Sequence, residues 1–100
     1  MRQTEYSQFI RLAAYFPEMQ LARDSKQVGN IIRRVRKKQG LNQTQLSEKT
    51  GLNQATISQV ENGRPSARID TLLTLFAALD LELRVAPRSK EWTIEPGGGS

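Results

Sequence analysis

The side chains that could do chemistry in this sequence are amides, hydroxyls and cations rather than catalytic groups. Histidine and cysteine are both absent from the 100 residues. The chain therefore lacks the commonest general base, the commonest metal ligand and any thiolate for a zinc site or a disulfide. Neither a glycine-rich phosphate loop nor a pair of carboxylates suited to acid–base work is found. We expect no enzymatic activity, no metal and no cofactor.

Positive charge is concentrated in the centre of the chain. Residues 23–68 contain ten basic and three acidic residues, a net charge of +7, whereas the rest of the chain contains five basic and seven acidic residues, a net charge of −2. A segment of this kind favours an anionic partner, although a solvated charged surface is the simpler alternative. No aromatic residue lies in the basic segment, which disfavours RNA recognition by base stacking.

The length and the hydropathy pattern limit the class of protein. One hundred residues are enough for one domain with a small core, which a second copy of the chain could extend. No apolar run approaches the roughly 18 residues of a membrane helix, and the first residues lack the apolar segment of a signal peptide. Together with the absence of cysteine, these features lead us to expect a cytoplasmic protein.

Apolar residues at spacings of three and four predict a mainly α-helical chain. Pro17 is expected to stop the first helix, and Ser25, Asn42 and Asn53 are expected to cap the next three. The predicted helices cover Thr4–Phe16, Lys26–Gln39, Gln43–Thr50, Gln54–Asn62 and Ile69–Leu79.

One strand is predicted after the last helix. Leu81, Leu83 and Val85 alternate with other residues, which is the pattern of a half-buried strand over Leu81–Ala86. A single strand leaves its backbone groups unpaired, and the same strand of a second copy is the simplest partner. We therefore expect dimerisation through Leu81, Leu83 and Val85.

Residues 43–62 have the spacing of a helix-turn-helix unit. Such a unit needs an apolar anchor followed by a small residue in its first helix, a turn residue that tolerates a positive φ, and apolar residues inside its second helix. Ser47 is the one departure, because alanine or glycine is more usual there. The matching residues are Leu46, Ser47, Gly51, Leu52, Ile57 and Val60.

Three stretches, residues 40–46, 54–58 and 61–63, resemble the Xre (phage-repressor-like) family. Residues 53–58 and 79–83 are similar in particular to the HipB-like antitoxins within that family. The resemblance covers residues 25–86. It implies an all-α, lambda-repressor-like helix-turn-helix domain of four to five helices with one C-terminal dimerising β-strand. Residues 1–24 would then be an N-terminal helical extension that the family pattern does not cover. Residues 87–100 would be a flexible tail that ends in Gly-Gly-Gly-Ser.

The resemblance also implies which side chains contact DNA. The second helix of the unit should enter the major groove, and its base-reading candidates are Asn53, Gln54, Ala55, Thr56, Ser58 and Gln59. For Thr56 and Ser58, local capping or solvent exposure is the alternative. The phosphate-binding candidates are Gln43, Thr44, Lys38, Asn62, Arg64 and Arg68, and Gln43 could also brace Gln54. The family pairs Arg36 with Glu61 in a structural ion pair, and a contact to DNA is the alternative. Arg33 and Lys38 are either phosphate-facing or simply solvated.

The partners implied by the resemblance are a palindromic double-stranded operator DNA, a second copy of the chain and a HipA-like serine/threonine kinase toxin. A free-standing Xre-type repressor without a toxin is the alternative, and the base-reading residues do not distinguish the two. The helix predicted before Pro17 is either additional core or a surface for the toxin or a third component. Trp92 is either part of a disordered end, a packing anchor or a toxin contact.

Overall fold

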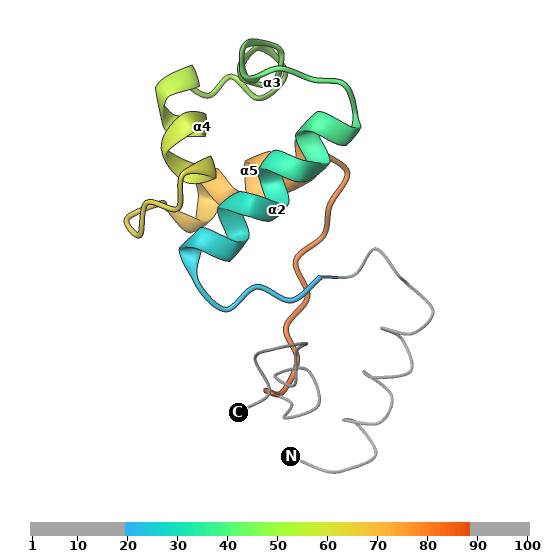
Figure 1. Ribbon diagram of the computed structural model, residues 1–100, viewed down its shortest axis with the longest axis vertical. Coiled ribbons are helices and arrows are strands. Elements are labelled where there is room, and N and C mark those ends of the chain that lie inside the picture. The colour runs from blue at the N-terminus through green and yellow to red at the C-terminus, as the bar shows by residue number, and fades with distance from the viewer. Residues whose placement is uncertain (1–19, 89–100) are drawn as a thin grey trace. The chain divides into compact units, whose positions relative to one another are not determined.

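Four helices follow one another in the computed structural model, which describes residues 20–88 (Figure 1). They are α2 (Ser25–Lys38), α3 (Gln43–Thr50), α4 (Gln54–Glu61) and α5 (Ile69–Ala78). Residues 22–83 form one compact unit, and the described residues on either side of it belong to a second unit. The helix predicted over Thr4–Phe16 and the tail with Trp92 lie outside the described residues. None of the four helices has the length and apolar content of a membrane span.

Side-chain caps explain where the helices begin. The N-cap of α2 is Asp24, whose side chain accepts a hydrogen bond from the backbone of Gln27, and not Ser25 as predicted. Ser25 is the first helical residue, and its hydroxyl donates to the carbonyl of Gly63, 38 residues later. A carboxylate is favoured at this position because the exposed N–H groups of the first turn are partly positive. The Asn42 cap of α3 and the Asn53 cap of α4 are as predicted.

Each helix contributes at least one side chain to a single apolar core. Helix α4 packs on both α2 and α3, and α5 packs on α3; Figure 1 shows α5 behind α2 in that view. The core explains why the short helices α3 and α4 are stable, because helices of eight residues are marginal on their own. The buried apolar residues are Ile32, Leu46, Ile57, Val60, Leu75 and Leu79.

The strand predicted over Leu81–Ala86 does not form in the single chain. Residues 81–88 have no regular secondary structure, and Leu83 is 51% exposed. The predicted all-α, helix-turn-helix fold class is otherwise confirmed. The difference has a physical reason: a strand needs a partner for its backbone N–H and C=O groups, and the described part of one chain offers no other strand.

Gly29 allows α2 and the end of α4 to approach one another closely. A Cβ at this position would lie 2.2 Å from the carbonyl oxygen of Val60 and 2.9 Å from that of Glu61. Both atoms belong to the backbone, so neither can move aside as a flexible side chain could. Glycine in the middle of a helix costs stability through its conformational freedom. At this position, it is the close packing of α2 on α4 that requires glycine.

Replacing Gly29 with alanine should therefore destabilise the protein despite the better helix propensity of alanine. We expect Gly29→Ala to lower the free energy of unfolding by about 1–3 kcal/mol, the usual cost of overpacking, as measured by urea unfolding. Asn30→Ala, at the exposed next position of α2, is the matched control and should change it by less than about 0.5 kcal/mol. Equal stabilities of the two variants would contradict this interpretation of Gly29.

Candidate nucleic-acid interface

The turn between α3 and α4 sets the angle at which α4 leaves α3. Gly51 has a φ of 76° in the left-handed region, and its N–H donates to the carbonyl of Ser47. Leu52 follows with both backbone groups bonded to side chains of α3: the hydroxyl of Ser47 donates to its carbonyl, and its N–H donates to the hydroxyl of Thr50 at 3.1 Å. The helix-turn-helix geometry is thus held by specific hydrogen bonds as well as by the buried Leu46 and Ile57.

The outer side of α4 carries short polar and small side chains. Of the six base-reading candidates, Thr56 and Ser58 are half-buried, and the other four are exposed. Asn53 also caps α4, because its carboxamide oxygen accepts from the backbone of Ala55 at 2.9 Å. A cap of this kind uses the oxygen and leaves the two N–H donors of the amide for a ligand. The exposed candidates are Asn53, Gln54, Ala55 and Gln59.

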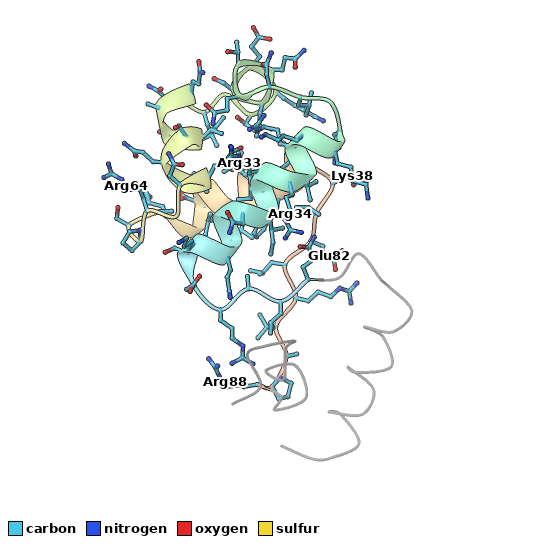
Figure 2. The ribbon with its side chains drawn as sticks, in the orientation of Figure 1. Arg33, Arg34, Lys38, Arg64, Glu82 and Arg88 are labelled. Atoms are coloured by element: carbon cyan, nitrogen blue, oxygen red, sulfur yellow. The ribbon has the colours of Figure 1, made fainter. Side chains whose placement is uncertain are left out.

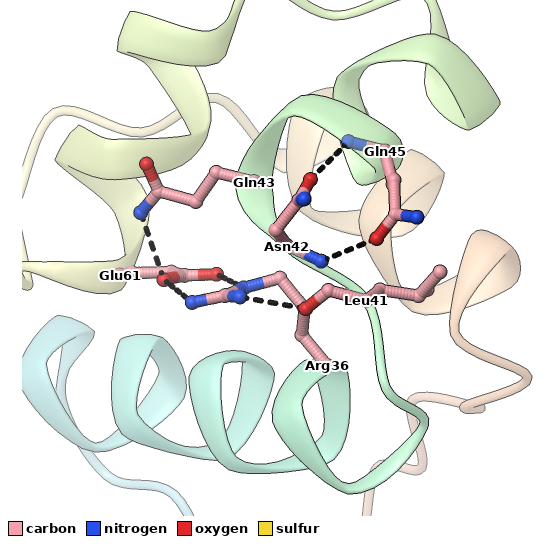
Figure 3. Close-up of polar contacts among 6 residues, drawn as sticks. All are labelled: Arg36, Leu41, Asn42, Gln43, Gln45 and Glu61. Carbon is pink, nitrogen blue, oxygen red and sulfur yellow. Dashed lines mark hydrogen bonds and ion pairs between the residues drawn. The ribbon is translucent and has the colours of Figure 1, made fainter.

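Arg36 and Glu61 form a buried ion pair between α2 and the last residue of α4 (Figure 3). Nε and Nη2 of Arg36 donate to the two carboxylate oxygens of Glu61, at 2.7 and 3.0 Å, and Nη1 donates to the carbonyl of Leu41 at 2.8 Å. The two residues are only 6% and 5% exposed. Because both carboxylate oxygens and three guanidinium N–H groups are bonded, the charges are compensated inside the core.

Gln43 does not brace Gln54 as the sequence led us to expect. Its side-chain nitrogen donates instead to an oxygen of Glu61 at 3.1 Å, so the first residue of α3 extends the buried ion pair (Figure 3). The contact to Gln54 comes from the next residue: the Thr44 hydroxyl donates to the carboxamide oxygen of Gln54 at 3.4 Å. The carboxamide nitrogen of Gln43 has two hydrogens, and this hydrogen bond uses one of them.

The candidate phosphate-binding side chains do not form one patch. Figure 2 shows Lys38 at the end of α2 and Arg64, in the segment between α4 and α5, on opposite sides of the view. Arg68 is the N-cap of α5, makes no capping hydrogen bond and forms an exposed ion pair with Asp70 at 3.4 Å. Asn62 is the exposed C-cap of α4. The cations therefore flank the helix-turn-helix on two sides.

The sequence did not predict the hydrogen bonds that the hydroxyl side chains of α3 make. Thr44, Ser47 and Thr50 recur every three residues, so they lie along one side of the helix, and all three bond to Leu52 or Gln54. We call these three residues the hydroxyl edge of α3. Their spacing is visible in the sequence, but the helix-turn-helix pattern requires only a small residue at Ser47. Its hydroxyl accounts for serine at a position where alanine or glycine is more usual.

Comparison with known proteins agrees with this geometry. A helix-turn-helix family model matches residues 32–85. The "ImmF control region 10 kDa protein" of Bacillus phage phi105 is 31% identical over 75 residues, which are 75% of this chain and 83% of that protein. A "HipB-O4 20mer complex" matches with a TM-score of 0.67 and 28% identity, over 71% of this chain and 100% of that chain. A "HipA-HipB-O2-O3 complex" matches with a TM-score of 0.66 and 28% identity, over the same shares.

The buried ion pair generates a prediction about stability. Arg36→Met leaves the carboxylate of Glu61 buried with one neutral donor, so we expect the free energy of unfolding to fall by about 3–5 kcal/mol. Urea unfolding followed by circular dichroism measures the change. Arg68→Met removes an exposed ion pair by the same substitution and should cost less than about 1 kcal/mol.

A double variant separates the cost of the unpaired charge from the worth of the pair. Arg36→Met combined with Glu61→Met removes both charges, and replacing a buried pair by apolar side chains is often nearly neutral. The double variant should therefore be more stable than Arg36→Met alone. If the double variant is less stable than Arg36→Met, the interaction within the pair is worth more than the cost of desolvating both charges. That result would contradict our account of the pair.

Proposed function

We propose that this chain is an antitoxin and transcriptional autorepressor. It belongs to the Xre-type helix-turn-helix family of DNA-binding regulators and is HipB-like within it. On this proposal it binds the operator of its own operon, which also encodes a HipA-like serine/threonine kinase toxin. The observation that carries the proposal is the exposed polar side of α4, with Asn53, Gln54 and Gln59, on a HipB-like fold. The similarity to both HipB complexes extends over the whole matched chain and supports the finer assignment.

Helix α4 supplies the contacts to the bases. Gln54, at its first position, has an exposed carboxamide that can accept from N6 and donate to N7 of adenine. The side chain of Ala55 and the methyl group of Thr56 can contact the methyl group of thymine. No acidic residue lies between Asn53 and Val60, so nothing on this side of the helix repels phosphates. The proposal is that this end of α4 lies in the major groove.

Groups on both sides of α4 supply the contacts to the DNA backbone. The N-terminus of α3 presents free N–H groups and the second hydrogen of the Gln43 amide, which suit a phosphate. Lys38 and Arg64 lie on opposite flanks of the described unit, as a protein that spans one groove requires (Figure 2). The remaining candidates are Thr44, Asn62 and Arg68, all exposed.

A second copy of the chain completes the DNA-binding unit. Ile69 and Leu73 are spaced by one turn on α5 and are 60% and 45% exposed, and Leu83 follows at 51%. Burial of this apolar surface in a homodimer would also give the predicted strand at Leu81–Ala86 its partner. Two recognition helices related by a twofold axis read a palindrome whose half-sites are one or two DNA turns apart. The toxin would bind away from the groove.

A free-standing repressor is the second candidate. It is favoured by the 31% identity to the phage phi105 protein, because the name of that protein refers to a control region and not to a toxin. The two candidates predict the same DNA contacts. They differ in whether a kinase gene lies beside this gene and whether its product co-purifies with the chain. If there is neither a neighbouring kinase gene nor a co-purifying kinase, the chain is a free-standing repressor and the antitoxin assignment is wrong.

The base-reading role predicts a loss of operator affinity on truncation of Gln54. We expect Gln54→Ala to weaken binding to the DNA immediately upstream of the gene about 10-fold, within the ~1–3 kcal/mol of a bidentate base contact. Fluorescence anisotropy at several salt concentrations measures it. The salt dependence should be steep and unchanged, since Gln54 touches no phosphate. Asn30→Ala removes an exposed amide from α2 and should bind like the parent. The proposal would be contradicted if the affinity is weak and depends neither on the mutation nor on the DNA sequence.

The proposed dimer interface predicts a change of oligomeric state. Leu73→Glu places a charge in the centre of the apolar surface of α5, and we expect a monomer by sedimentation equilibrium where the parent is a dimer. Gln45→Glu adds the same charge to α3 and preserves a side-chain acceptor for the capping box, so it should stay dimeric. A dimeric Leu73→Glu would place the interface elsewhere.

A further inference from the structure

We infer that Thr44 is a positioning residue that determines specificity, because it holds the carboxamide of Gln54 in one orientation for base reading. The inference deepens the proposed function and rests on it. Thr44 and Gln43 were both expected to bind phosphate, and Gln43 was also a candidate to brace Gln54. In the structure, Thr44 donates to Gln54 and Gln43 donates to Glu61.

The hydroxyl edge of α3 makes such a brace effective. Ser47 and Thr50 bond both backbone groups of Leu52, the residue that precedes the Asn53 cap of α4. The start of α4 is therefore fixed relative to α3 before any side chain of α4 meets a ligand. Thr44 lies one turn earlier on the same edge, and its hydroxyl reaches the first side chain of α4. The three hydroxyls thus fix the backbone of the turn and then the Gln54 side chain.

The direction of the hydrogen bond matters for which base is read. The carboxamide oxygen of Gln54 faces the Thr44 hydroxyl, and it still has a second lone pair for N6 of adenine. Its nitrogen keeps both hydrogens and can donate to N7. Without the hydroxyl, the carboxamide could turn over and present its donor where the acceptor should be. The brace therefore favours adenine contacts over the reversed pattern and lowers the ordering cost on binding.

Thr44 has one hydroxyl proton, and this decides between its two possible roles. A phosphate oxygen only accepts hydrogen bonds, so the hydroxyl cannot donate to it while it donates to Gln54. Gln43, which is bonded to the buried Glu61, still has a hydrogen for a phosphate. On this inference the two roles are divided: Gln43 contacts the DNA backbone, and Thr44 orients the side chain that contacts the base.

The test is a selection of preferred sites from randomised DNA duplexes, followed by affinity measurements on the selected site and on single-base-pair variants of it. The proteins are the parent, Thr44→Val, Thr44→Ser, Gln54→Ala and the double variant of Thr44→Val with Gln54→Ala. Thr44 is exposed, so the thermal unfolding curve of Thr44→Val should match that of the parent. Thr44→Ala is a second variant without the added methyl group.

We expect Thr44→Val to lower discrimination at one base pair of each half-site roughly 3- to 10-fold, the range that the loss of one hydrogen bond supplies. Binding to non-specific DNA and its salt dependence should stay the same. Thr44→Ser keeps the hydroxyl and should retain the discrimination. In the double variant, loss of the hydroxyl should add nothing to the effect of Gln54→Ala, because the two act as one unit.

Four results would overturn the inference. If Thr44→Val weakens binding to every sequence alike and reduces the salt dependence, Thr44 contacts phosphate. If the two single effects add in the double variant, Thr44 acts independently of Gln54. If the parent selects no preferred site, the proposed function fails and the inference fails with it. A selected site that Thr44→Val reads as well as the parent removes the inference and leaves the proposed function in place.

Discussion

The buried ion pair between Arg36 and Glu61 is the constraint on which the rest of this small fold depends. Its five polar groups, the three donors of Arg36 and the two oxygens of Glu61, bond to one another, to the carbonyl of Leu41 and to Gln43. The pair therefore connects α2, the segment before α3, the first residue of α3 and the last residue of α4. Since a buried charge without its partner is costly, only one relative placement of these elements satisfies all of them. Gly29, which lies against the backbone carbonyls of Val60 and Glu61, lets α2 and α4 come close enough.

The short helices α3 and α4 depend on this frame for their order. Eight residues form too few internal hydrogen bonds to hold a helix in water. The two helices gain the missing stability from three sources. These are the caps at Asn42 and Asn53, the core contacts of Leu46 and Ile57, and the hydrogen bonds around Leu52. A recognition helix needs this rigidity, since a mobile one would lose conformational entropy on every binding event.

The sequence predicted the elements that local patterns determine. Helix positions followed from apolar spacing and from Asn caps, and the resemblance supplied the Arg36–Glu61 pairing. The sequence did not predict side-chain contacts that depend on residues far away in the chain. Ser25 donates to the carbonyl of Gly63, and Asp24 caps α2 in its place. Gln43 donates to Glu61 and not to Gln54. The need for Gly29 depends on carbonyls some thirty residues away. The strand predicted at residues 81–86 does not form for another reason, because the described part of one chain offers no strand to pair with it.

The two sides of α4 have consequences for how this protein can diverge over evolutionary time. Ile57, Val60 and Glu61 are buried, whereas Asn53, Ala55 and Gln59 are exposed and take no part in the core. With the base contacts that we propose, duplicated copies of the gene could therefore acquire separate DNA targets by substitutions on the exposed side while they keep one scaffold. Gln54 is the exception, because its partner is Thr44 on another helix. A lineage that changes one of these two residues should come under selection to change the other, so the pair should vary together among descendants.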